Sequence, residues 1–133
     1  HAADHEETSP DTTEPVVTRL ACALVEVNGT VHFTPESRLH VIYGAESAHE
    51  GYHCSFGVNP AYRERLEQHG LHFTAFADDG DVRAAEWPAH PFFVGTLFQP
   101  ERAALLDHTH PLPLAFVTAA AVPRELRIAG TSS

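Results

Sequence analysis

The chain has 133 residues, a formal net charge of −10 and a hydrophobic fraction of 43%, a composition typical of one globular domain. The acidic balance argues against nucleic acid and anionic membrane surfaces as partners, and neither a membrane-spanning run nor a signal peptide is visible. The two cysteines lie far apart and form neither a disulfide framework nor a zinc-binding spacing, which predicts a cytoplasmic protein.

The first third of the chain predicts a loop and then a hairpin. Methionine is absent even at position 1, so we expect His1 to follow a cut and the chain to be the downstream part of a longer one. Residues 1–15 are acidic and rich in Thr, Ser and Pro, which is typical of a solvated loop. The apolar run Leu20–Val27 and the alternating run Thr30–Phe33 flank Asn28-Gly29, a strong hairpin signal.

The middle of the chain predicts a short helix, a strand and a longer helix. Pro35–Tyr43 favours a helix that ends at Gly44, because glycine is the preferred residue just past a helix. Its inward-facing residues would be Leu39, Val41, Ile42 and Tyr43. Tyr52–Val58 indicates a strand, and Pro60–His69 indicates an amphipathic helix with proline in its first turn.

The last third predicts a second hairpin, a buried strand and a final helix. Leu71–Ala77 and Val82–Trp87 alternate around an aspartate-rich turn, which lacks the ligand spacing of a calcium loop. The apolar run Phe92–Phe98 indicates a buried strand that ends at a proline. Leu114–Val122 favours an apolar helix, and residues 129–133 a frayed tail.

Asp107, His108 and His110 form a group whose spacing could suggest a metal site. The chain contains 11 histidines, so two of them at positions i and i+2 are a weak signal. We therefore expect these to be surface histidines, with no metal and no cofactor.

Gln99 and Glu101 directly follow the predicted buried strand, at the end where open α/β sheets place their chemistry. The stretch His90–Glu101 resembles the last strand of class I glutamine amidotransferase domains, of the CTP synthase type most closely, whose pattern is H-P-x-F-V-x-x-x-F-H-P-E. In that family the His and the Glu complete a Cys-His-Glu triad. The resemblance therefore implies a catalytic role for Glu101, while Gln99 stands where the family has its His.

Matches with the same family extend over nearly the whole chain. They include Tyr43-Gly44, Val58-Asn59-Pro60 and Gly70-Leu71. The resemblance implies an α/β fold, with residues 1–133 as the carboxyl-terminal half of a glutamine amidotransferase-like domain. This half would be part of a flavodoxin-like sheet with helices and β-hairpins. The missing upstream half would hold the Gly-x-Cys-x-Gly nucleophile turn.

The resemblance also implies substrate-binding positions on two segments. Glu7 falls on the family's Glu that binds the amino group of glutamine. Glu50–Asn59 aligns with the pattern E-R-H-R-H-R-Y-E-V-N, in which the Arg residues help to recognise the glutamine carboxylate. His53 and Ser55 replace two of those Arg residues, and Phe56 replaces the Tyr.

Three hypotheses about function stay open. The first is a glutamine amidotransferase-like protein of the CTP synthase type, incomplete and degenerate. Gln99 has no titratable nitrogen, and neither Cys22 nor Cys54 has the Gly-flanked turn of a nucleophile. The second is a non-catalytic module that binds a ligand or partner, and the third is a redox protein that uses Cys54. The alternative for both cysteines is a small buried thiol.

The partners that we expect follow from the same resemblance. They are glutamine or a related small molecule, and the missing upstream half of the domain. A second copy of the chain is a further candidate, because removal of the upstream strands would leave a sheet edge uncovered.

Overall fold

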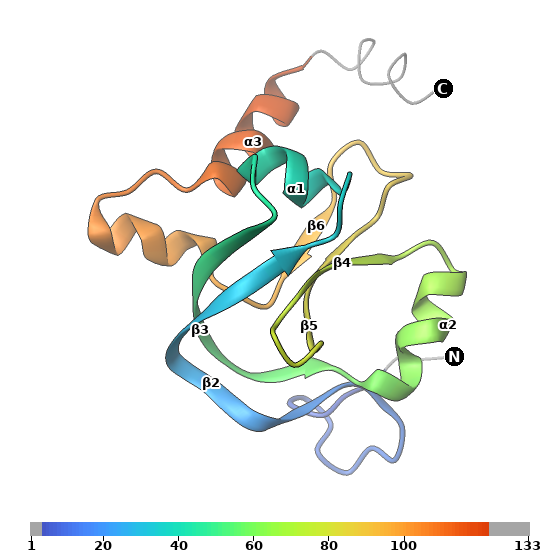
Figure 1. The fold of residues 1–133 in the computed structure, drawn as a ribbon. Helices are drawn as coiled ribbons and strands as arrows, with labels where there is room; N and C mark the ends of the chain where they lie inside the picture. Colours follow the sequence, from blue (N-terminus) through green and yellow to red (C-terminus); the bar gives the residue numbers. More distant parts are fainter. Residues whose placement is uncertain (1–3, 123–133) are drawn as a thin grey trace.

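A curved, mostly antiparallel sheet organises the part of the chain that the computed structural model describes, residues 4–122 (Figure 1). The strand order is β1-β2-β4-β5-β6, and β3 also pairs with β2. The strands are β1 (Asp4–His5), β2 (Pro15–Phe33), β3 (Ser47–Val58), β4 (His72–Phe76), β5 (Val82–Glu86) and β6 (Val94–Thr96). The helices are α1 (Arg38–Tyr43), α2 (Arg63–Gln68) and α3 (Pro111–Ala121), with the 3-10 helices η1 (Pro60–Tyr62) and η2 (Pro100–Leu106).

One continuous strand replaces the hairpin that the sequence predicts at Asn28-Gly29. β2 runs through both residues and pairs them with Gly51 and Glu50 of β3. The predicted turn needs a positive φ at its two central residues, and neither has one. A positive φ of 52° lies instead at Glu26, where the register of β2 shifts. The prediction is wrong because β3 offers a long partner, whose cross-strand hydrogen bonds outweigh the local turn signal.

α1 confirms the predicted short helix, over a narrower range and with a different buried face. The Ser37 hydroxyl accepts the His40 N–H at its start, and Gly44 ends it at a φ of 63°. Leu39 is fully buried but Val41 is 73% exposed, so the prediction that Val41 packs inward is wrong. Successive helix residues are about 100° apart, and Val41 therefore points away from the Leu39 face.

The carboxyl-terminal strands follow the predicted order, but the last one is short. β4 and β5 form the predicted hairpin, whose turn uses Gly80 at a φ of 86°. β6 has only 3 residues and pairs with β5 alone among the described strands, so the predicted strand over Phe92–Phe98 is too long. Phe93, just before β6, is 42% exposed. After β6 the chain leaves the sheet, and Phe98 is only 1% exposed.

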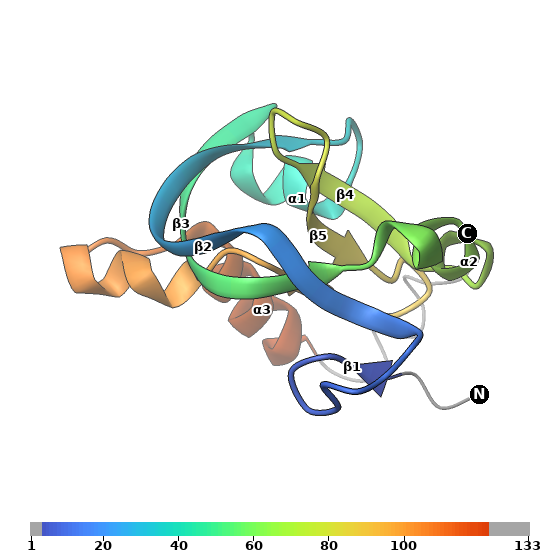
Figure 2. The ribbon, with the colours of Figure 1, turned by 90° about the horizontal axis from the view of Figure 1, so that it is seen from below.

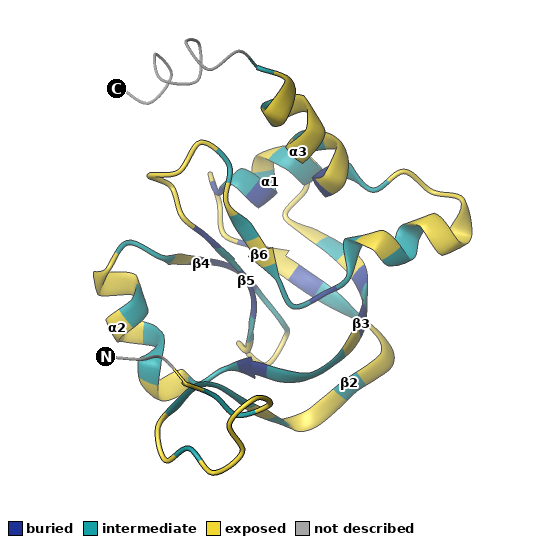
Figure 3. Cartoon of the chain, turned by 180° about the vertical axis from the view of Figure 1, so that it is seen from behind, coloured by how far each residue is buried: buried dark blue, intermediate teal, exposed yellow. Residues whose placement is uncertain are grey.

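The core lies where the sheet meets α1 and α3 (Figure 3). Its buried members are Val31, Phe33, Leu39, Tyr52, Ala75, Ala84, Phe98 and Leu112. The predicted loop over residues 1–15 contains a short strand, β1, which lies against the start of β2 (Figure 2). Only residues 6–14, between the two strands, form an irregular loop. The predicted tail, residues 129–133, lies outside the described residues.

Candidate functional site beside Gln99

Phe98 and the backbone of β3 position Gln99. The buried Phe98 side chain anchors the chain just before it. The Gln99 N–H donates to the Gly51 carbonyl at 3.0 Å, and its side-chain Nε2 lies 3.5 Å from the His53 carbonyl. Glu101 is exposed in the first turn of η2. The structure thus holds Gln99 against β3 and leaves Glu101 at the nearby surface.

β3 connects Gln99 to the amino-terminal segment. At the far end of the strand, the Arg19 guanidinium lies 5.2 Å from the centre of the Phe56 ring, and the His5 ring lies 5.8 Å from it. Arg19 and Phe56 are also partners across the β2–β3 pair. The strand between these two points carries the predicted substrate-binding residues His53, Ser55 and Phe56.

Glu6, rather than Glu7, is the acidic residue fixed onto β2. Its Oε2 accepts the Thr18 hydroxyl at 2.6 Å and the Arg19 backbone N–H at 2.5 Å. These hydrogen bonds lower the pKa of the Glu6 carboxyl, and the one from Thr18 has the largest effect. Glu7 is exposed, and its carboxylate lies 4.0 Å from the His5 ring. The role of Glu7 toward the amino group of glutamine stays a prediction.

A hydrogen-bond network that the sequence analysis missed joins β2, β3 and η2. The Glu26 carboxylate accepts hydrogen bonds from both terminal nitrogens of Arg102, at 3.2 and 2.5 Å. Its Oε1 also lies 2.8 Å from Nδ1 of His53. A bidentate arginine–carboxylate pair has a defined geometry, so the pair links Arg102 of η2 to Glu26 of β2. The signals in the sequence were a glutamate that interrupts the apolar run Leu20–Val27 and an arginine directly after Glu101.

A pocket of about 420 Å³ lies next to Gln99. Its polar lining includes Asn28, His49, Glu50, Gln99, Arg102 and His110. The volume falls within the range of roughly 300–1,000 Å³ that is usual for small-molecule sites. No three metal-ligating side chains lie together within residues 4–122. The polar lining suits a small polar molecule bound by hydrogen bonds.

Comparisons with known proteins connect this geometry to a family. No family model matches the chain. CTP synthase of Rhodococcus jostii is 35% identical over 134 residues, and CTP synthase of Rubrobacter xylanophilus is 36% identical over 126 residues. These matches take in 89% and 88% of this chain but only 23% of each relative. A solved structure, described as the glutaminase domain of Trypanosoma brucei CTPS with bound acivicin, matches with a TM-score of 0.81 and 28% identity.

The chain is related to the glutaminase domain of CTP synthase. The structural match covers 90% of this chain and 50% of the solved one, and it confirms the predicted α/β fold with an open flavodoxin-like sheet. Within this CTP synthase-related fold, the roles of Gln99, Glu101 and the substrate-binding residues rest on the motif and stay predictions. No helix among residues 4–122 has the length and apolar character needed to cross a membrane.

A buried network borders the pocket of this CTP synthase-related chain. The Glu50 and His110 side chains are each 8% exposed, and Nε2 of His110 lies 2.8 Å from Glu50 Oε1, which also accepts the Tyr43 hydroxyl. Nδ1 of His110 accepts the Leu112 N–H at the start of α3, so the proton of a neutral ring sits on Nε2 and faces Glu50. Burial, and then the bond to Glu50, raise the pKa of Tyr43.

The prediction of surface histidines is therefore wrong for His110. Its two ring nitrogens have partners inside the fold, one at the start of α3 and one on Glu50, so burial leaves neither unsatisfied. His108 and Asp107 are exposed, as that prediction expected.

The two cysteines have different environments. Cys22 is exposed, in the irregular stretch of β2 where pairing with β3 is interrupted, so the prediction that it is buried is wrong. Cys54 is half-buried in β3, and its thiol donates to the Phe56 carbonyl at 3.0 Å. A redox role for Cys54 stays a hypothesis.

Removing the guanidinium next to Glu26 is expected to raise the pKa of the Glu26 carboxyl. The hydrogen bonds from Arg102 first, and then the one from His53, hold this pKa below its ordinary value. A carboxyl carbon NMR titration should therefore show a higher midpoint in Arg102→Met than in the parent chain. Arg65→Met, on the exposed side of α2, is the matched control and should leave the midpoint unchanged.

The sign of the linked stability effect follows from the lowered pKa. The contribution of the Glu26 contacts is present above the unfolded-state pKa and is lost as the pH falls through the lower folded-state pKa. Equal titration midpoints in Arg102→Met and the parent chain would contradict the network.

Proposed function

We propose that the chain forms the carboxyl-terminal half of a glutamine amidotransferase-like site of the CTP synthase type, one that in this form cannot complete glutamine hydrolysis. The relation to the glutaminase domain of CTP synthase supports the class of site. The proposed loss of activity rests on Gln99, which occupies the sequence position of the motif's His. The backbone of β3 holds Gln99 through the Gly51 and His53 carbonyls. The domain assignment of residues 1–133 and a cytoplasmic location belong to the same proposal.

The chemistry of such a site requires a base at position 99. Hydrolysis begins when a cysteine thiolate attacks the carboxamide carbon of glutamine, and ammonia leaves after its nitrogen is protonated. A histidine takes the thiol proton and passes it to the leaving nitrogen, while a carboxylate orients the ring. The Gln99 amide does not titrate near neutral pH, so it can orient a substrate but cannot transfer this proton.

A second candidate function is a non-catalytic module that binds a ligand in the same pocket. The Glu26–Arg102–His53 network favours it, because it fixes the Arg102 guanidinium, which lines the pocket together with Gln99. Preorganised donors reduce the ordering cost of binding, and a site that only binds needs no proton transfer. The two candidates predict different results for Gln99→His in a protein that also has the nucleophile. The first predicts that glutamine hydrolysis is restored, and the second predicts that it is not.

The purified chain is expected to release no ammonia from glutamine above the buffer background, because its sequence contains no Gly-x-Cys-x-Gly nucleophile turn and Gln99 cannot act as the base. A coupled assay for ammonia measures this, with a CTP synthase glutaminase domain as the positive control. Saturation-transfer NMR on the same samples reports whether glutamine binds. Binding without ammonia agrees with both candidates, which Gln99→His then separates, whereas ammonia release by the chain itself would overturn the proposed loss of activity.

We also propose that a further polypeptide segment covers part of β2. Between the residues paired with β1 and those paired with β4, one edge of β2 has no partner within residues 4–122. Val25 and Val27 in this stretch are 44% and 40% exposed. Open edges of this kind pair with other strands. The other half of a glutaminase domain, or a second copy of the chain, would fit. Light scattering over a concentration series identifies the second copy by a mass that rises with concentration.

A further inference from the structure

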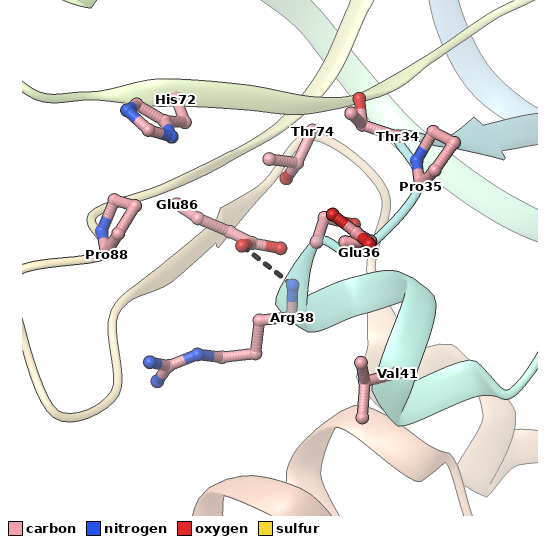
Figure 4. Close-up of a pocket in the computed structure, with 10 residues that line it drawn as sticks. Thr34, Pro35, Glu36, Arg38, Val41, His72, Thr74, Glu86 and Pro88 are labelled. Carbon is pink, nitrogen blue, oxygen red and sulfur yellow. Dashed lines mark hydrogen bonds between the residues drawn. The ribbon is translucent and has the colours of Figure 1, made fainter. Parts of the chain in front are cut away.

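A second pocket, of about 500 Å³, lies between the start of α1 and the β4–β5 hairpin. It shares no lining residue with the pocket at Gln99, and the glutamine chemistry makes no use of it. Figure 4 shows Glu36 on the turn before α1, Thr74 on β4 and Glu86 at the end of β5, all facing the same space. The volume falls within the range that is usual for small-molecule sites.

The Thr74 hydroxyl is a buried polar group without a partner. Thr74 is 5% exposed, and its Oγ1 has no hydrogen-bond partner within the described residues. Figure 4 places this hydroxyl on the side of Thr74 that faces Glu86 and Glu36. An unsatisfied buried hydroxyl is unfavourable, and a ligand that donates a hydrogen bond in this pocket would satisfy it.

Two carboxylates give the pocket its negative charge. Glu86 is 5% exposed, and its two oxygens accept the backbone N–H groups of Arg38 and Leu39 at 3.0 and 2.8 Å. Each of these oxygens keeps the capacity to accept a further hydrogen bond. Glu36 is exposed and borders the same space (Figure 4). A cationic ligand would offset both charges.

The one arginine that lines the pocket does not neutralise these carboxylates. The Arg38 guanidinium donates to the Pro91 carbonyl at 2.6 Å and lies 5.1 Å from the centre of the Phe92 ring. Figure 4 shows the Arg38 side chain extended away from Thr74. The remaining titratable group that faces the pocket is His72, which is exposed.

We propose that this pocket binds a small organic cation that carries a primary ammonium group on a short apolar skeleton. The three N–H donors of the ammonium match three acceptors, the Thr74 hydroxyl and the carboxylates of Glu86 and Glu36. The apolar skeleton would contact Pro35, Val41 and Pro88. A neutral alcohol of the same length lacks the charge, and a quaternary ammonium ion lacks the donors.

The test is a titration of the chain with n-butylammonium, followed by amide proton–nitrogen NMR. 1-Butanol and tetramethylammonium are the matched probes. We expect saturable shifts around Thr74 for n-butylammonium alone. Thr74→Val should weaken binding by roughly tenfold, the loss of one hydrogen bond to a charged group, while Thr74→Ser keeps the affinity. Glu36→Gln should also weaken it, and Glu67→Gln, on the exposed side of α2, should not.

Thermal melts of each variant show whether a loss of binding comes from a loss of folding. Thr74→Val removes a hydroxyl that has no partner in the ligand-free chain, so its melting temperature should equal or exceed that of the parent. Equal affinity of Thr74→Val and the parent chain would overturn the proposal. So would 1-butanol binding as tightly as n-butylammonium, or the absence of any saturable shift. If Thr74→Val does not fold, the comparison of Glu36→Gln with Glu67→Gln decides the outcome.

Discussion

Replacing Gln99 by histidine is expected to raise the rate of glutamine hydrolysis by roughly 10²–10⁴-fold, the usual contribution of a general base. The experiment uses a protein that joins this chain to the nucleophile-bearing half of a CTP synthase glutaminase domain, because the chain has no Gly-x-Cys-x-Gly turn of its own. The backbone contact from Gln99 to Gly51 does not involve the side chain, so a histidine at this position keeps the same anchor. The ammonia assay measures the gain.

Two matched variants show whether the gain comes from the restored base. Replacing the catalytic His of the parent CTP synthase domain by Gln should lower its rate by a comparable factor. Adding Glu101→Gln to Gln99→His should remove much of the gain, because a carboxylate that orients the ring stabilises its protonated form. If Gln99→His folds with the nucleophile present and the rate does not rise, the site has lost more than its base, and the non-catalytic candidate is favoured.

Phe98→Ala is expected to lower the free energy of unfolding by about 3–5 kcal/mol, the usual cost of deleting a buried phenylalanine. Phe98 is 1% exposed, and its ring lies edge-on to Tyr52, with ring centroids 6.4 Å apart. The alanine would leave a cavity between the end of β6 and β3. A whole domain is stable by only ~5–15 kcal/mol, so this change removes a large share of the total. Urea denaturation measures the difference.

Phe93→Ala is the matched control for this prediction. Phe93 precedes β6 as Phe98 follows it, but it is 42% exposed, so its removal should cost much less. A folded Phe98→Ala protein should also lose order at Gln99, because the anchor before it is gone. Equal losses of stability for the two variants would show that Phe98 is not the residue that fixes this end of the site.

Local signals in the sequence were sufficient for the type and order of most elements. Gly44 and Gly80 adopt the positive φ that a helix end and a hairpin turn need, and glycine reaches that conformation without strain. Alternating apolar residues predicted the β4–β5 hairpin, because successive side chains of a strand face opposite sides. The motif around Gln99 and Glu101 also pointed to the family, because this motif is a short continuous stretch of chain.

The tertiary structure alone decided the features that depend on distant partners. β2 continues through Asn28-Gly29 because β3 pairs with it. The residues around Asn28-Gly29 contain no information about this pairing, because β3 is distant in the sequence. Glu26 meets Arg102 across 76 positions of sequence, and His110 meets Glu50 across 60, so neither contact leaves a periodic pattern. Such contacts form only after the strands and helices have brought the side chains together, which is why the sequence by itself determined the elements but not the network around the site.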